Sequence, residues 1–130
     1  MELNIKDLLE NKGILDEKNT EKTKVLEIKS LKSIGDGKIT IKNIDDETFD
    51  RIGETSKTDY ELNKNALYNA VIEPNLKDKE LQEGFGCKTN PIGIVRKLFT
   101  RAEIENISEE IGKLSGMYRE KGLIKEIKNA

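Results

Sequence analysis

Apolar residues follow a helical repeat most clearly near the C-terminal end of the chain. Between residues 101 and 115, isoleucine and leucine recur at spacings of 3, 4 and 3, which places them on one face of an α-helix. Thr100 and Glu103 have the spacing of a capping box at its start, and Gly116 can end it in the left-handed conformation. The pattern therefore predicts an amphipathic helix over residues 101–115. Its buried face consists of Ile104, Ile107, Ile111 and Leu114.

Start and stop signals predict four further helices in the middle of the chain. Asp45 can accept hydrogen bonds from the free N–H groups of a helix that ends near residue 53 or 56. A second helix runs from about residue 59 to 72, because Pro74 lacks an N–H and disfavours the helical conformation at the residue before it. Asp78 opens a short helix, and Pro91 at a first helical position opens another that ends at Phe99.

Segments 25–28 and 39–42 are rich in β-branched residues with partial alternation, which is typical of strands. Gly35 and Gly37 lie between them and permit the positive φ angles of a turn. This pattern predicts a β-hairpin over residues 25–44.

The first 24 residues carry fewer structural signals. Apolar residues between positions 3 and 9 have the spacing of a short helix, whereas residues 16–24 are nearly all charged or polar and are expected to form a loop. We therefore expect residues 1–24 to be a partly mobile N-terminal segment.

Together these elements predict one domain of the α+β class, mostly α-helical, over residues 1–130. An N-terminal β-hairpin (25–44) is followed by a compact helical bundle of about five helices (45–116). Residues 117–130 are expected to form a weaker C-terminal helical segment, because Leu123, Ile124 and Ile127 give only a short apolar stripe.

The charge of the chain is high but balanced. Lys and Arg number 23 and Asp and Glu number 25, so the formal net charge is -2. Affinity for nucleic acid or an anionic membrane comes chiefly from clustered basic residues, and neither partner is expected. The chain has no apolar run long enough to cross a bilayer, and its N-terminus lacks the pattern of a signal peptide. An intracellular protein is expected.

Residues suited to catalysis are scarce. Histidine, the commonest general base near neutral pH, is absent, and Cys87 is the only cysteine. A disulfide within the chain or a zinc site built from cysteines is therefore excluded. The acidic residues at 45–50 lack the pattern of a calcium-binding loop and suit the start of a helix instead. We expect a binding protein with no enzymatic activity, no cofactor and no metal.

One alternative is a helix-turn-helix regulator. Residues 78–99 can be arranged as two helices around Gly86, with Arg96 and Lys97 on the second helix. The balanced charge and the small number of aromatic residues argue against DNA binding.

A series of structural positions between residues 60 and 116 can be compared with known families. These positions are residues 71–76 (VIEPNL), Asp78, Leu81, Pro91, residues 95–99 (VRKLF), Glu103, Ile104, Ile111 and residues 114–116 (LSG). Their sequence resembles that of the XkdN-like phage tail assembly chaperones, which also have a β-rich segment upstream. Arg101 and Ala102 stand where that family often has a Pro-Gly pair, and residues 16–24 have no counterpart in it.

The resemblance implies a protein of the bacterial host's cytoplasm, absent from the mature virion. It would bind the tape measure protein and keep it soluble during tail tube assembly. The tail tube protein and a second copy of the chain are further candidate partners, and a structural tail component is an alternative function. Joined to the apolar pattern after residue 116, the resemblance leads us to predict a partner-binding surface that includes Met117, Leu123, Ile124 and Ile127.

Overall fold

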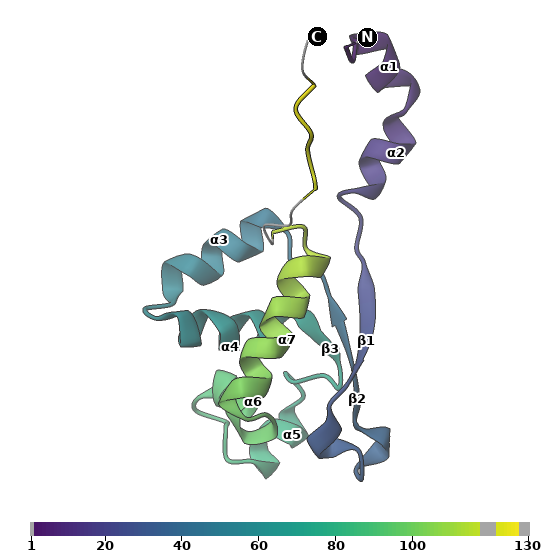
Figure 1. Ribbon diagram of the computed structural model, residues 1–130. Helices are drawn as coiled ribbons and strands as arrows, with labels where there is room; N and C mark the ends of the chain where they lie inside the picture. Colours follow the sequence, from purple (N-terminus) through teal and green to yellow (C-terminus); the bar gives the residue numbers. More distant parts are fainter. Residues whose placement is uncertain (1, 118–121, 128–130) are drawn as a thin grey trace.

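A computed structural model describes residues 2–117 and 122–127 of the chain (Figure 1). The fold is α+β and mostly helical, with a β-hairpin near the N-terminus followed by packed helices, which confirms the predicted class. The helices are α1 (Ile5–Glu10), α2 (Lys12–Glu17), α3 (Asp46–Thr55), α4 (Asp59–Ala70), α5 (Lys79–Gly84), α6 (Ile94–Leu98) and α7 (Arg101–Leu114). Short 3-10 helices are η1 (Lys29–Leu31), η2 (Gly35–Gly37) and η3 (Pro91–Gly93).

The sheet has three antiparallel strands in the order β1 (Thr23–Glu27), β2 (Lys38–Lys42) and β3 (Val71–Glu73). β1 and β2 form the predicted hairpin, joined through η1 and η2. Gly37 has φ 64°, and a Cβ atom there would lie 2.7 Å from the carbonyl carbon of Leu31. Only glycine fits this close approach of two backbone segments without a shift.

The third strand was not predicted. The helix expected over residues 59–72 ends as α4 at Ala70, and the chain continues directly as β3. Val71 pairs with Ile41 of β2, and both side chains are buried. Residues 71 and 72 are β-branched, so pairing with β2 overrides the local helical pattern.

The core lies where α4 and α7 pack against each other and against the sheet (Figure 1). The helix predicted over residues 101–115 is confirmed as α7, and its capping box between Thr100 and Glu103 is present. Three of its four apolar side chains are buried, whereas Leu114 is partly buried. The largest fully buried side chains are Ile41, Leu67, Leu76, Ile94, Ile104, Ile111 and Val95.

Polar contacts connect the hairpin to α7 across most of the sequence. Lys24 Nζ lies 2.7 Å from Glu110 Oε1, and the two residues are 86 positions apart. Ser30 Oγ donates a hydrogen bond to Glu103 Oε2 at 2.5 Å over 73 positions. The first strand and the last helix are therefore neighbours in space.

An N-terminal arm made of α1 and α2 projects away from the body (Figure 1). The predicted first helix is present, but residues 12–17, part of which was expected to be loop, form α2. Good helix formers such as Lys, Leu and Glu there outweigh the cost of Gly13. Neither helix buries a residue. The arm is held to the sheet at its base, where Asn43 Oδ1 accepts from the Lys22 backbone N–H at 2.9 Å.

The C-terminal segment differs from its predicted form where it can be compared. Residues 122–127 contain no helix, although a helical segment was expected over residues 117–130; residues 118–121 and 128–130 lie outside the described part of the chain. Gly122, with φ 85°, interrupts helical order there, and the apolar stripe is too short to stabilise a helix without a surface to pack on.

Candidate functional site

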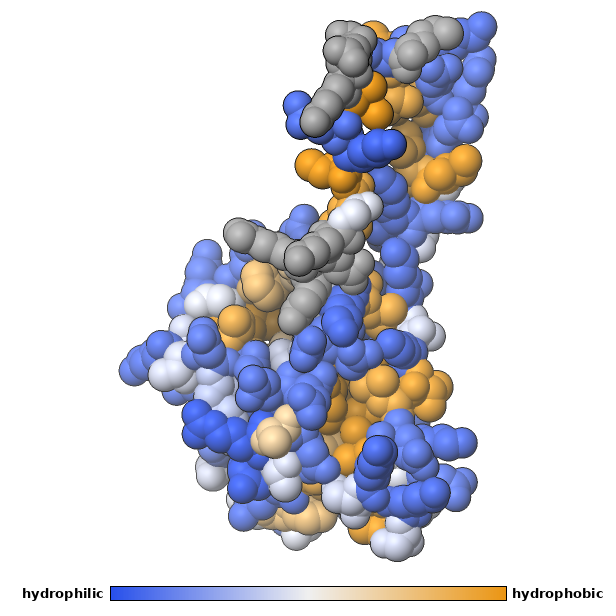
Figure 2. Space-filling model, viewed as in Figure 1, coloured by the Kyte–Doolittle hydropathy of each residue, from blue (hydrophilic) through white to orange (hydrophobic). Residues whose placement is uncertain are grey.

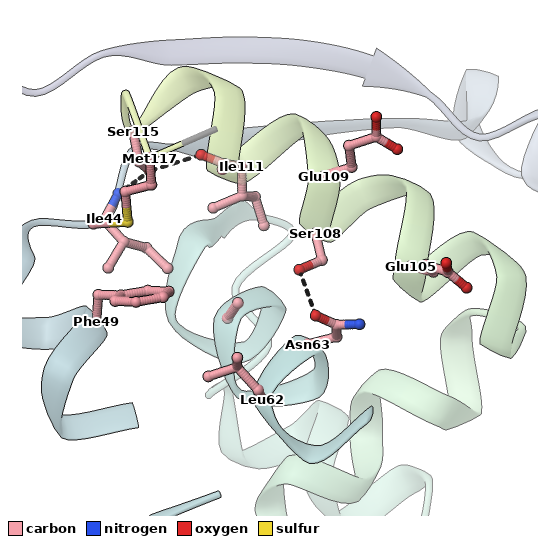
Figure 3. Close-up of a pocket in the computed structure, with 12 residues that line it drawn as sticks. Ile44, Phe49, Leu62, Asn63, Glu105, Ser108, Glu109, Ile111, Ser115 and Met117 are labelled. Atoms are coloured by element: carbon pink, nitrogen blue, oxygen red, sulfur yellow. Dashed lines mark hydrogen bonds between the residues drawn. The ribbon is translucent and has the colours of Figure 1, made fainter. Parts of the chain in front are cut away.

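A groove of about 350 Å³ lies between α4 and α7, beside the start of α3 (Figure 3). Ile44 and Phe49 contribute at one end, and Glu105 lies at the other (Figure 3). Its full lining is Ile44, Phe49, Leu62, Asn63, Ala66, Glu105, Ser108, Glu109, Ile111, Gly112, Ser115 and Met117. The floor is apolar, and the groove opens to solvent along its length.

Local sequence signals explain how these elements present the groove. Asp45 caps α3, because its side chain accepts from the Thr48 backbone N–H at 2.7 Å. This cap holds Ile44 and Phe49 on either side of the helix start, as a hydrophobic staple would. Ile44 is buried, whereas Phe49 remains 39% exposed at the mouth of the groove. Phe49 thus offers apolar surface that the fold does not cover.

Hydrogen bonds fix the two long walls relative to each other. Ser108 Oγ of α7 donates to Asn63 Oδ1 of α4 at 3.0 Å (Figure 3). The backbone N–H of Ile44 donates to Ser115 Oγ at 2.8 Å, at the other end of α7. One bond thus joins α7 to α4, and the other joins the end of α7 to the start of α3.

Met117 lies at the point where the chain leaves this groove. Its backbone N–H donates to the Gly112 carbonyl at 3.0 Å, and the Gly116 N–H donates to the Lys113 carbonyl at 3.2 Å. With Gly116 at φ 69°, this is a Schellman motif, and it confirms the predicted end of the helix. The motif turns the Met117 side chain onto the groove (Figure 3). Methionine is flexible and polarizable, which suits contacts with varied apolar partners.

Two carboxylates of α7 lie on one rim of the groove. Glu109 is 3.6 Å from Lys113, an exposed pair that contributes little stability. Glu105 is exposed and forms no ion pair with another residue that the structure describes. A ligand with a basic flank would therefore meet an unneutralised carboxylate here.

The four residues predicted to bind a partner are not brought together. Met117 lines the groove, whereas Leu123, Ile124 and Ile127 lie on the C-terminal segment with 69%, 93% and 65% of their surface exposed. Their role stays a prediction. Sequence reasoning missed the groove itself, since Leu62, Phe49 and Ile111 come from three separate helices and share no local pattern.

Exposed apolar side chains also occur away from the groove. In the space-filling view hydrophilic residues cover much of the body, whereas hydrophobic residues are visible on the N-terminal arm and on the hairpin side of the body (Figure 2). The exposed apolar side chains of the arm are Leu3, Ile5, Leu8, Leu9 and Ile14. None of these side chains lines the groove between α4 and α7.

Catalytic and metal sites have little support in the described part of the chain. No group of three His, Cys, Asp or Glu side chains there could hold a metal ion. Cys87 is 4% exposed, and its Sγ contacts the Phe85 carbonyl at 3.6 Å. Among the described residues, no helix is long and apolar enough to span a membrane.

The helix-turn-helix alternative does not fit the geometry of α5 and α6. That motif joins its helices by a turn of about 3–4 residues, whereas here Phe85 to Asn90 separate α5 from η3 and α6 has only 5 residues. Arg96 uses its guanidinium to donate to the Phe99 carbonyl at 3.2 Å, which stabilises the end of α6.

Comparison with known families gives one match. The family model described as phage XkdN-like tail assembly chaperone protein matches residues 5–128. The match extends well beyond residues 60–116, where the sequence resemblance lies, and includes both the N-terminal arm and the C-terminal segment. No curated protein and no solved structure matches the chain.

Proposed function

We propose that this chain, which belongs to the XkdN-like phage tail assembly chaperone family, binds the tape measure protein and keeps it soluble while the tail tube assembles. The family match over residues 5–128 carries the proposal, because it assigns the chain a role in tail assembly. The tape measure protein as client, with the tail tube protein as a second candidate, is our extension of that role.

The physical need for such a partner comes from the client. A tape measure protein is a long helical chain with apolar stripes, and such stripes aggregate unless another surface covers them. An open groove between two helices can receive the apolar face of an amphipathic helix, with anchors at helical spacing. The groove between α4 and α7 has this form.

We place the client-binding surface at this groove and the segment that follows it. Met117 joins the two, and Leu123, Ile124 and Ile127 extend the apolar surface beyond the body. The remaining surface is rich in charges of both signs, which favours solubility of a complex. Binding alone can fulfil this role, without catalysis or a cofactor, in the cytoplasm of the host.

Co-expression tests the proposal. The soluble fraction of the tape measure protein is measured with the chain, without it, and with a chain carrying Leu123→Ser, Ile124→Ser and Ile127→Ser. A matched control removes three exposed apolar side chains elsewhere, by Leu3→Ser, Ile5→Ser and Leu9→Ser. We expect the wild-type and control chains to raise the soluble fraction and the C-terminal triple variant to lose most of this effect.

Each outcome bears on a different part of the proposal. If the wild-type chain neither co-purifies with the tape measure protein nor raises its solubility, the client is wrong. If the C-terminal triple variant acts like wild type, the function stands and the assigned surface is wrong. Finding the chain as a stoichiometric component of purified particles would favour a structural tail protein instead.

A further inference from the structure

The groove lies directly beside the chain segment that leaves it. Met117 lines one end, and the described chain resumes at Gly122 after residues 118–121. In this structure residues 122–127 extend away from the body and leave the groove open (Figure 1). The most exposed apolar side chain of the segment, Ile124, has nothing that covers it.

The chemistry of the segment complements that of the groove. Its apolar residues, Leu123, Ile124 and Ile127, have the spacing of one face of a short helical turn. Lysines at 121, 125 and 128 flank them in the sequence. The groove offers an apolar floor and, on the α7 rim, the exposed carboxylate of Glu105. Apolar residues would thus meet the floor while lysines face the acidic rim.

The length of the chain allows the segment to reach the whole groove. Along α7 the groove extends from Ser115 to Glu105, which is about 15 Å at 1.5 Å per residue. Residues 118–127 can span up to about 33 Å when extended. The positive φ angles of Gly116 and Gly122 provide turns at both ends of the connection. The chain is therefore long enough for residues 122–127 to lie along the groove.

We propose that the groove is the docking site for the C-terminal segment of the same chain, residues 122–127, and that a client displaces the segment from the groove and then contacts both the groove and the segment. The docking is argued from the groove and the segment alone, whereas the displacement by a client rests on the proposed function. Docking within one chain is favoured over docking between copies because a short tether gives a high effective concentration.

The docked form should be only marginally stable, which allows a client to displace the segment. Docking removes the exposed surface of three aliphatic side chains from water, which is favourable. It also orders a chain segment that includes Gly122, and the entropy cost is of similar size. The docked form therefore shields the groove from wrong partners and yields to a client with a longer apolar face.

Paramagnetic broadening in NMR spectra tests the docking without any client. A nitroxide is attached to Asn129→Cys in the full chain with Cys87→Ser, so that the label lies just beyond the docking segment. We expect the amide signals of Asn63, Ser108 and Gly112 to lose most of their intensity and those of α5 to keep theirs. Adding Leu123→Ser, Ile124→Ser and Ile127→Ser should restore the groove signals.

A second measurement uses no label and keeps Cys87. The amide shifts of the groove residues should differ between the wild-type chain and the C-terminal triple variant, and not between wild type and the variant with Leu3→Ser, Ile5→Ser and Leu9→Ser. Broadening that is absent from the groove, or that persists in the triple variant, overturns the proposal. In a further sample, an isotope-labelled chain without nitroxide is mixed with an unlabelled chain that carries the nitroxide. If the groove signals of the isotope-labelled chain broaden, the segment docks between chains and the intramolecular form is overturned. Neither measurement includes the tape measure protein, so the outcome of this test does not depend on the outcome of the co-expression test.

Discussion

The hydroxyl oxygen of Ser115 accepts a hydrogen bond from the backbone N–H of Ile44 at 2.8 Å, and the same hydroxyl donates to the Ile111 carbonyl at 2.6 Å. Ile44 precedes α3 and Ser115 follows α7, 71 positions later. One side chain therefore fixes the wall that closes the groove at the end where Met117 leaves it.

Replacing this hydroxyl should destabilise the fold. Ser115→Ala leaves the N–H of buried Ile44 without its partner, and such a loss costs about 1–3 kcal/mol. Urea unfolding followed by circular dichroism measures the change. Thr20→Ala is the control, because the Thr20 hydroxyl bonds to the exposed Glu17 carbonyl and its loss should stay within about 0.5 kcal/mol. Equal losses in both variants would show that Ile44 finds water instead.

Truncating Ile107 should create a cavity in the core. Its side chain is 3% exposed and belongs to the buried face of α7. Ile107→Ala should lower the free energy of unfolding by about 2–5 kcal/mol. The adjacent Asn106 is exposed, and Asn106→Ala is the matched control with an expected change below about 0.5 kcal/mol. A loss that small at Ile107 would mean that α7 faces the other way.

Alanine substitutions at the two glycines of η2 distinguish the cost of backbone strain from the cost of steric overlap. Gly35 and Gly37 both have positive φ, so alanine at either position costs about 1–2 kcal/mol. Only at Gly37 would the new Cβ lie within 3 Å of backbone atoms of Leu31 and Lys32. Gly37→Ala should therefore destabilise the protein clearly more than Gly35→Ala, as measured by thermal unfolding. The same shift in both would show that η1 moves away freely.

Acid should weaken the contact between the hairpin and α7. The hydrogen bond from Lys24 holds the pKa of Glu110 below its ordinary value, more than burial raises it. Burial raises the pKa of Glu103, but hydrogen bonds from Ser30 and Thr100 outweigh it and the pKa is lowered. A lowered pKa gives stability that is present above the ordinary value, about 4.3, and is lost as the pH falls through the folded-state value.

Urea unfolding at several pH values checks this sign. The free energy of unfolding should fall as the pH drops from about 5 toward 3. The variant Glu110→Gln should start less stable at neutral pH and show a shallower fall, because it no longer loses the Lys24 contact on protonation. An unchanged slope in this variant would assign the acid sensitivity to other carboxylates.

Cys87 should have no chemical role. Its thiol is buried in the core, and the chain contains no histidine to act as a base. We expect Cys87→Ser to preserve tail assembly, and the native thiol to react with a maleimide far more slowly than the unfolded one. Loss of tail formation by a stably folded Cys87→Ser protein would contradict this expectation.

Features set by neighbouring residues could be predicted from the sequence. The capping box at Thr100, the cap at Asp45 and the turn at Gly116 each depend on groups within a few positions, and all three are present. The hairpin was also predictable, because its two strands are adjacent in the sequence and the connection between them, residues 28–37, contains Gly35 and Gly37.

Features that depend on residues far apart in the sequence could not be predicted from it. Val71 becomes part of a strand because Ile41 pairs with it, and no signal near residue 71 reveals that partner. The groove arises only when α3, α4 and α7 pack together, so its lining has no period in the sequence. Met117 was predicted to bind a partner; it lines the groove, and its role in binding stays a prediction. The helical segment expected after it is not formed by residues 122–127.

The contact of the first strand with the last helix has a consequence for synthesis of the protein. Lys24 and Ser30 are synthesised early, and their partners on α7, Glu110 and Glu103, follow 86 and 73 residues later. The hairpin and α4 must therefore wait with their apolar faces uncovered until translation has passed residue 115 and α7 has emerged. Once α7 has closed the core, the described residues 122–127 do not enter it, so substitutions there should leave folding of the body during synthesis unchanged.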